Sequence, residues 1–216
     1  MYKGCIFDLD GTLTDTLESL TYSVNETLKE MKLPAIEDEQ CRMFVGNGAR
    51  VLLEKSLKAA GDRNNSRIDE AMERYGRIFG ENCTYHVEPY DGIRTMLGEL
   101  KSRGIKIAVL SNKPHQQAVD VVENIFGKGI FTYVLGQCDD IPRKPDPSGV
   151  FVVLDKMHLN ADECLYIGDS EVDIATGSAA GVDTVGVEWG FRSKEVLKRA
   201  GAAQTIEKPS ELLSLL

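Results

Sequence analysis

The chain alternates short apolar runs with amphipathic stretches, and this pattern restricts its fold more than any other feature. The apolar runs are rich in isoleucine and valine and are followed by polar residues or glycine, at residues 5–7, 105–110, 132–135, 164–167 and 184–187. Helical spacing separates most of them, at about residues 92–103, 114–126, 147–158, 171–180 and 193–200. Because buried strands that alternate with helices form a parallel sheet, we predict an α/β fold with helices on both faces of that sheet.

One long segment, residues 15–85, departs from this alternation. It contains no convincing strand, and its apolar residues recur at helical spacing, first at Leu17, Leu20, Val24, Leu28 and Met31 and again around residues 51–57 and 68–79. Asp15 and Glu18 resemble a capping box at the start of the first helix. We therefore predict a small all-helical domain over residues 15–85, inserted after the first strand into a Rossmann-like core of residues 1–14 and 86–216.

The overall composition limits the class of partner. Hydrophobic residues make up 42% of the chain and charged residues 27%, which is usual for a globular protein. The net charge of -9 disfavours nucleic acid and acidic membranes, and no apolar stretch approaches the ~18 residues of a membrane-spanning helix. No signal peptide is evident, and the five scattered cysteines form no CxxC pair. We expect a cytoplasmic protein with reduced thiols, either a monomer or a weak homodimer.

The segment after the first strand carries the most informative polar residues. The strand runs directly into Asp8 and Asp10, whose side chains can face one pocket if the extended backbone continues. Gly11 then permits a tight turn of the backbone. Ligands bind at the carboxyl ends of strands in parallel α/β sheets, so the location suits chemistry. Taken alone, the segment is equally compatible with a solvated turn.

Two further strand ends supply groups that can hold an anion. Ser111, Asn112 and Lys113 follow the second predicted strand with a hydroxyl, an amide and a cation, and such groups bind phosphate oxygens. Ser111 or Asn112 could equally cap the helix that follows. Lys144 precedes a proline turn that leads into another helix. It could neutralise an aspartate or a phosphate, although a lysine in a loop is more often a solvated charge.

A fourth strand end adds two more carboxylates. Asp169 follows the strand at 164–167, and Asp173 lies near the first turn of the helix expected after it. Asp169 could bind a hard cation and Asp173 could orient its neighbours, or Asp169 could serve only as a helix cap. A cluster of carboxylates is unfavourable without a cation, and oxygen ligands favour Mg²⁺ over zinc. We therefore expect a magnesium site.

These four segments, taken in order, resemble the motifs of the haloacid dehalogenase superfamily of phosphotransferases. The matching letters are DxDGT, SNK, KPDP and GDSxxD, which are carried by Asp8, Asp10, Ser111, Lys144, Asp169 and Asp173. Their order and spacing fit across essentially the whole chain, and the helical insert resembles the α-helical cap of that superfamily. The resemblance implies a magnesium-dependent phosphatase that acts on a small phosphorylated metabolite.

The resemblance also implies a role for each motif residue. Asp8 is the expected nucleophile, which takes the phosphoryl group as an aspartyl-phosphate, and Asp10 is the expected general acid and base. Mg²⁺ is expected to bind the side chains of Asp8 and Asp169 and the backbone carbonyl of Asp10. Asp173 would support the metal site and Lys144 without binding the ion itself. The transferring phosphate is expected to contact Ser111, Lys144, Asn112, Gly11 and Thr12.

Within this superfamily, two segments resemble the phosphoglycolate phosphatases. They are residues 45–50 of the insert and residues 188–192 near the end of the chain. Arg50 could then meet the carboxylate of 2-phosphoglycolate, or it could be a solvated arginine. Asp10 argues against a dehalogenase, because that branch lacks an aspartate at this position. The alternatives are a β-phosphoglucomutase-like mutase, an inorganic pyrophosphatase and, in another class, a catalytically idle binding module.

Overall fold

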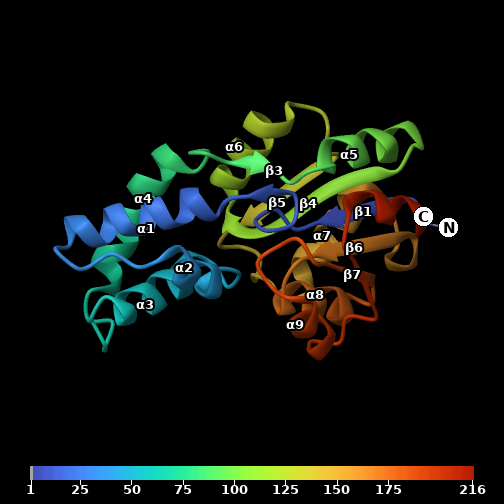
Figure 1. The fold of residues 1–216 in the computed structure, drawn as a ribbon. Coiled ribbons are helices and arrows are strands. Elements are labelled where there is room, and N and C mark those ends of the chain that lie inside the picture. The colour runs from blue at the N-terminus through green and yellow to red at the C-terminus, as the bar shows by residue number, and fades with distance from the viewer. Residues whose placement is uncertain (1) are drawn as a thin grey trace. The chain divides into compact units, whose positions relative to one another are not determined.

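The computed structural model describes residues 2–216, which form two compact units. The larger unit comprises the described residues through Asp15 together with Glu88–Leu216, and the smaller unit comprises Thr16–Val87. The two ends of the smaller unit lie within two residues of the ends of the helical insert expected from the sequence, residues 15–85. Figure 1 shows the fold and labels elements of both units where there is room.

A six-stranded parallel sheet forms the centre of the larger unit (Figure 1). In spatial order its strands are β5 (Tyr133–Gln137), β4 (Lys106–Pro114), β1 (Gly4–Phe7), β6 (Cys164–Gly168), β7 (Asp183–Val187) and β8 (Gln204–Ile206). Each strand runs parallel to its neighbours, which confirms the predicted parallel sheet. The sequence did not indicate β8, because that strand is short and begins with the polar residues Gln204 and Thr205.

Helices connect the strands in the predicted order. They are α5 (Ile93–Ser102), α6 (His115–Phe126), α7 (Ser148–Met157), α8 (Glu171–Ala180) and α9 (Lys194–Arg199), with short 3-10 helices at η1 (Ala161–Glu163) and η2 (Pro209–Ser214). The bounds of α5 to α9 lie within a residue of those predicted from the apolar spacing. The larger unit is therefore the Rossmann-like α/β fold that the alternating pattern predicts.

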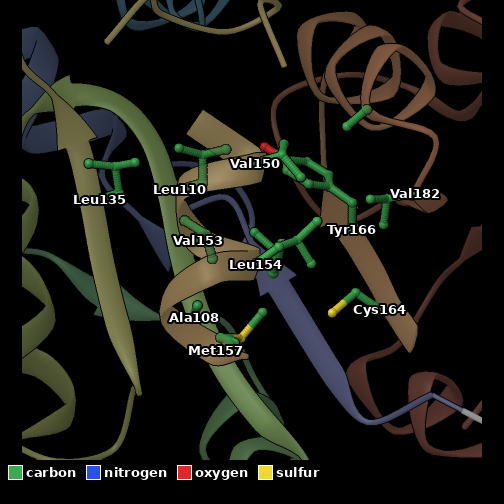
Figure 2. Close-up of a cluster of buried hydrophobic side chains, with 12 residues drawn as sticks. Ala108, Leu110, Leu135, Val150, Val153, Leu154, Met157, Cys164, Tyr166 and Val182 are labelled. Carbon is green, nitrogen blue, oxygen red and sulfur yellow. The ribbon is translucent and has the colours of Figure 1, made fainter. Parts of the chain in front are cut away.

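Hydrophobic side chains pack α7 against one face of the sheet (Figure 2). This cluster includes Val150, Val153, Leu154 and Met157 of α7 and Ala108, Leu110, Cys164 and Tyr166 of the strands. Successive strand side chains point to opposite faces, and the alternate residues Cys5, Phe7, Ile107 and Val109 are also buried. Both faces of the sheet are therefore covered. Burying one such side chain contributes about 1.5–3 kcal/mol, so this packing holds the strand ends in place.

The smaller unit is built from helices, namely α1 (Leu17–Glu30), α2 (Asp38–Phe44), α3 (Ala49–Ala59) and α4 (Ile68–Asn82). Glu30 at the end of α1 accepts from Arg74 and Arg77 of α4 at 2.9 and 2.7 Å. These ion pairs join the first and last helices of the unit. The sequence did not indicate α2, because Cys41 is its one buried residue and no apolar periodicity results.

The segments that lead into and out of the helical unit pair with each other as two short antiparallel strands. They are β2 (Thr14–Asp15) and β3 (Glu88–Pro89). The predicted capping box of Asp15 and Glu18 is wrong, because α1 begins after Thr16, which makes no side-chain cap. Asp15 belongs to the strand pair instead. No helix within residues 2–216 is both long enough and apolar enough to cross a bilayer.

Candidate active site

The carboxyl ends of three neighbouring strands bring the predicted site residues together. β4, β1 and β6 lie side by side in the sheet, and Asp8 and Asp169 directly follow β1 and β6. The backbone N–H of Asp8 donates to Ile167 at 2.9 Å, so the pairing of β1 with β6 extends as far as Asp8. Ser111 lies within β4, which runs on to Pro114 rather than ending at Leu110 as the sequence indicated. The predicted motifs therefore lie together at the edge of the sheet formed by the carboxyl ends of its strands.

Lys144 is a buried cation at the centre of this group. Its ammonium contacts Asp8 Oδ1 at 2.8 Å and Asp173 Oδ1 at 2.7 Å. Burial alone would lower the pKa of Lys144, but the charges of Asp173 and Asp8 outweigh that effect and hold the pKa well above its usual value. The lysine is therefore charged at neutral pH and is not the solvated charge that a loop position more often indicates.

Asn112 holds the backbone of Lys144 from both sides. Its Oδ1 accepts from the Lys144 N–H at 2.9 Å, and its Nδ2 donates to the Lys144 carbonyl at 3.1 Å. Asn112 was predicted to contact phosphate, whereas these bonds give it a structural task, which is to fix the loop that carries Lys144. A contact of Asn112 with phosphate stays a prediction.

Asp173 is completely buried and orients its neighbours. Ser170 is the N-cap of α8 and forms a capping box with Asp173 in the first turn of that helix. Asp173 Oδ2 accepts from the backbone N–H and the hydroxyl of Ser170, while Oδ1 accepts from Lys144 and from the Tyr166 hydroxyl at 3.2 Å. Because both oxygens already accept two hydrogen bonds, Asp173 is suited to supporting the site and not to binding an ion directly.

The carboxylates of the site carry more charge than their lysine neutralises. Oxygen atoms of Asp8, Asp169 and Asp173 lie within 4.8 Å of one another, and all three residues are buried. Burial raises the pKa of Asp8 to about 7, and the charge of Asp173 adds to the shift. Burial and the same charge hold the pKa of Asp169 well above its usual value. When all three carboxylates are ionised, they leave two negative charges beyond the one that Lys144 neutralises, which fits a divalent cation.

Asp10 forms a second buried ion pair. Lys113 Nζ contacts Asp10 Oδ1 at 2.9 Å, with the side chains 1% and 12% exposed. From the sequence, Lys113 has no expected role beyond a general affinity for anions. No local signal pairs Lys113 with Asp10, because β4 has a register irregularity between Leu110 and Pro114, where side chains need not alternate regularly. The predicted metal contact of the Asp10 carbonyl stays a prediction.

The turn after β1 lies against Asp169. Gly11 has a φ of +87, and a Cβ atom there would lie 2.4 Å from Asp169 Oδ2, so this position requires glycine. Thr12 is fully buried and its Oγ1 donates to Asp169 Oδ1 at a long 3.4 Å. Ser111 is also buried, and its hydroxyl accepts from the Lys113 N–H at 3.2 Å. The predicted phosphate contacts of Gly11, Thr12 and Ser111 stay predictions.

Arg50 belongs to the smaller unit and is half exposed. Its guanidinium donates to Asp69 at 2.8 Å and lies 4.0 Å from Glu54. Arg50 is the second residue of α3, whose N-cap Gly48 has a φ of +82°. In this structure the guanidinium of Arg50 therefore forms surface ion pairs. The contact of Arg50 with a substrate stays a prediction.

Comparison with known proteins identifies the family. Residues 5–187 match the family model described as haloacid dehalogenase-like hydrolase. The chain is 33% identical to a phosphoglycolate phosphatase of Rhodospirillum rubrum over 94% of its length and 86% of that protein. It is 31% identical to a phosphoglycolate phosphatase of Aquifex aeolicus, over 98% of this chain and 95% of the relative.

Solved structures agree in fold over almost the whole chain. A protein of Lactobacillus delbrueckii subsp. bulgaricus with the provisional name phosphoglycolate phosphatase superposes with a TM-score of 0.92 at 29% identity, covering 99% of this chain and 98% of the other. A predicted phosphoglycolate phosphatase of Haemophilus somnus has a TM-score of 0.91 at 26% identity, over 99% and 97% of the two chains. The chain therefore belongs to the haloacid dehalogenase-like hydrolase family, in which it is a phosphoric monoester hydrolase similar to the phosphoglycolate phosphatases.

Proposed function

We propose that this protein is a Mg²⁺-dependent phosphatase that hydrolyses 2-phosphoglycolate through an aspartyl-phosphate on Asp8. The observation that carries the proposal is the buried cluster of Asp8, Asp169 and Asp173, whose ionised carboxylates would exceed the charge of Lys144 by two. A divalent cation neutralises that excess, and oxygen ligands that retain water favour magnesium. Asp8 and Asp169 would hold the ion, with the Asp10 carbonyl as a further ligand.

The proposed reaction begins at Asp8. A carboxylate oxygen of Asp8 attacks the phosphorus, the bond to the leaving oxygen breaks, and Asp10 supplies the proton that this oxygen takes. A water molecule then attacks the phosphorus of the aspartyl-phosphate while Asp10 accepts its proton. Inorganic phosphate leaves and Asp8 is restored. The bound ion supplies positive charge that offsets the repulsion between phosphate and carboxylates.

Two cationic or polar groups would hold the transferring oxygens. The Lys144 ammonium, which Asp8 and Asp173 hold in place, would bring its positive charge next to an oxygen of the transferring phosphate. Ser111 would add its hydroxyl. The smaller unit would act as a cap that excludes water during attack on phosphorus, with β2 and β3 next to the hinge segments.

The choice of substrate draws on the relatives named phosphoglycolate phosphatase. A direct test is phosphate release from 2-phosphoglycolate, β-glucose 1-phosphate, pyrophosphate and an aryl phosphate, each with Mg²⁺ and with EDTA. We expect release only with Mg²⁺, and a kcat/KM for 2-phosphoglycolate at least about 10-fold above the others, the lower end of the discrimination that a binding pocket achieves. Preference for another phosphate would contradict the substrate, and full activity in EDTA would contradict the role of the metal.

Arg50 is the residue that we expect to recognise the carboxylate of the substrate. Replacing Arg50 with alanine should lower kcat/KM for 2-phosphoglycolate by about 10–100-fold, the effect of one hydrogen bond to a charged group. Activity on an aryl phosphate should fall much less. Arg77→Ala is the matched control, because Arg77 is also a half-exposed arginine of the smaller unit in an ion pair. Equal losses of kcat/KM on both substrates would show that Arg50 does not recognise the carboxylate of the substrate.

A further inference from the structure

Two loops enclose Asp169 from opposite sides. Asp169 follows β6, which lies between β1 and β7 in the sheet. The turn after β1 approaches from one side with Gly11 and Thr12, and the loop after β7 approaches from the other with Trp189, Gly190 and Phe191. The loop after β7 has no role in the proposed binding of metal and phosphate.

Each oxygen of the Asp169 carboxylate accepts from a different loop. The backbone N–H of Phe191 donates to Oδ2 at 2.7 Å, and the Thr12 hydroxyl donates to Oδ1 at 3.4 Å. The short bond comes from the loop after β7, so that loop contributes the stronger restraint on the carboxylate. The orientation of Asp169 is therefore set from both sides.

Trp189 joins the two loops directly. Its indole N–H donates to the Thr12 carbonyl at 3.0 Å across 177 residues of sequence. Gly190 allows this close approach, because a Cβ atom there would lie 2.3 Å from Asp169 Cβ and 2.3 Å from the Gly11 carbonyl oxygen. A residue with a side chain at 190 would push the loops apart.

We propose that Trp189 and Gly190 are positioning residues for the metal site. The Trp189 hydrogen bond closes the turn after β1 and the loop after β7 on Asp169, so that the carboxylate is held in the orientation that binds Mg²⁺ next to Asp8. This inference rests on the magnesium site of the proposed function. Hydrogen bonds that orient a metal ligand typically change metal affinity by about 10–100-fold.

The test is Mg²⁺ binding to the substrate-free protein, measured by titration calorimetry. Trp189→Phe keeps an aromatic ring and removes the N–H donor, and we expect its Kd for Mg²⁺ to rise about 10-fold. With substrate present, raising Mg²⁺ should restore kcat and leave KM for the substrate unchanged. A Kd equal to that of the wild type would overturn the inference, because a purely structural tryptophan would alter stability and not metal affinity.

Tyr2→Phe is the matched control. It also removes one aromatic donor between the β1 segment and β7, since the Tyr2 hydroxyl donates to Asp183 at 2.7 Å at the opposite end of these strands. Its Kd for Mg²⁺ should equal that of the wild type. If the wild-type protein itself binds no Mg²⁺, the proposed function fails and the inference fails with it. If the wild type binds and Trp189→Phe binds equally well, the inference alone fails.

The fluorescence of the wild-type chain offers a second measurement. Trp189 is the single tryptophan, so emission excited selectively at tryptophan reports on the surroundings of this one indole. Adding Mg²⁺ should change the emission with the same Kd that calorimetry gives, and Asp169→Asn should abolish the change. An emission that stays constant while calorimetry records binding would show that the indole does not sense the site, which contradicts the proposal.

Discussion

Replacing Asp8 with asparagine should lower kcat by at least about 10⁴-fold, the scale seen when a nucleophile is removed from a group of residues that act together. The amide is nearly the same size as the carboxylate but cannot attack phosphorus. The fold should survive, because the backbone N–H of Asp8 continues to bond Ile167. Phosphate release from 2-phosphoglycolate with saturating Mg²⁺ measures the loss. Residual turnover above about one per cent would contradict the assignment of Asp8 as nucleophile.

At pH 8, the same variant should be more stable than the wild type when EDTA removes divalent ions. Burial raises the pKa of Asp8 to about 7, so the folded state retains a proton that the unfolded state releases near pH 4. Stability of the metal-free wild type therefore falls as pH rises from about 4 to about 7, and Asp8→Asn lacks this contribution. Urea unfolding at pH 5 and pH 8 in EDTA measures the difference.

The control for Asp8→Asn is the same exchange at an exposed aspartate. Asp155 lies on the exposed side of α7, and Asp155→Asn should change neither kcat nor the pH dependence of unfolding. Saturating Mg²⁺ should reverse the order of stability between the wild type and Asp8→Asn, because the bound ion replaces the proton on the wild-type carboxylate. An unchanged order would contradict metal binding by Asp8.

Replacing Lys144 with methionine should destabilise the protein by about 3–5 kcal/mol, the usual effect of removing one partner from a buried ion pair. The methionine fills most of the space, but Asp8 and Asp173 lose the ammonium at 2.8 and 2.7 Å that separates their charges. Urea unfolding in EDTA at pH 8 gives the free energy of unfolding. Activity should also be lost, because the cation that would hold the transferring phosphate is gone.

A control variant at an exposed lysine tests whether the loss of any positive charge would destabilise the protein as much as the loss of Lys144. The Lys128 side chain is 83% exposed beside Glu123, and Lys128→Met should leave stability and kcat unchanged. Saturating Mg²⁺ should reduce the destabilisation of Lys144→Met, since the ion then neutralises part of the carboxylate cluster. A change below about 1 kcal/mol in EDTA would show that Lys144 is not the counter-charge of the cluster.

Local signals in the sequence were sufficient for the fold class and for the motif positions. Apolar runs bounded by polar residues predicted five of the six strands in the main sheet, and apolar spacing predicted the bounds of α5 to α9. These signals are local because burial on a strand or helix repeats with the period of that element. Where burial leaves no periodic trace, as in α2 with only Cys41 buried, the prediction failed.

The partners of the site residues were decided only by the tertiary structure. Lys113 pairs with Asp10 across 103 residues, Asn112 holds the backbone of Lys144, and Trp189 reaches the turn after β1. Such contacts depend on the order and register of parallel strands, which no short stretch of sequence encodes. The sequence by itself therefore determined the candidate site residues, whereas the packing of β4, β1, β6 and β7 decided which of them touch, because only folding brings the ends of these strands to one edge of the sheet.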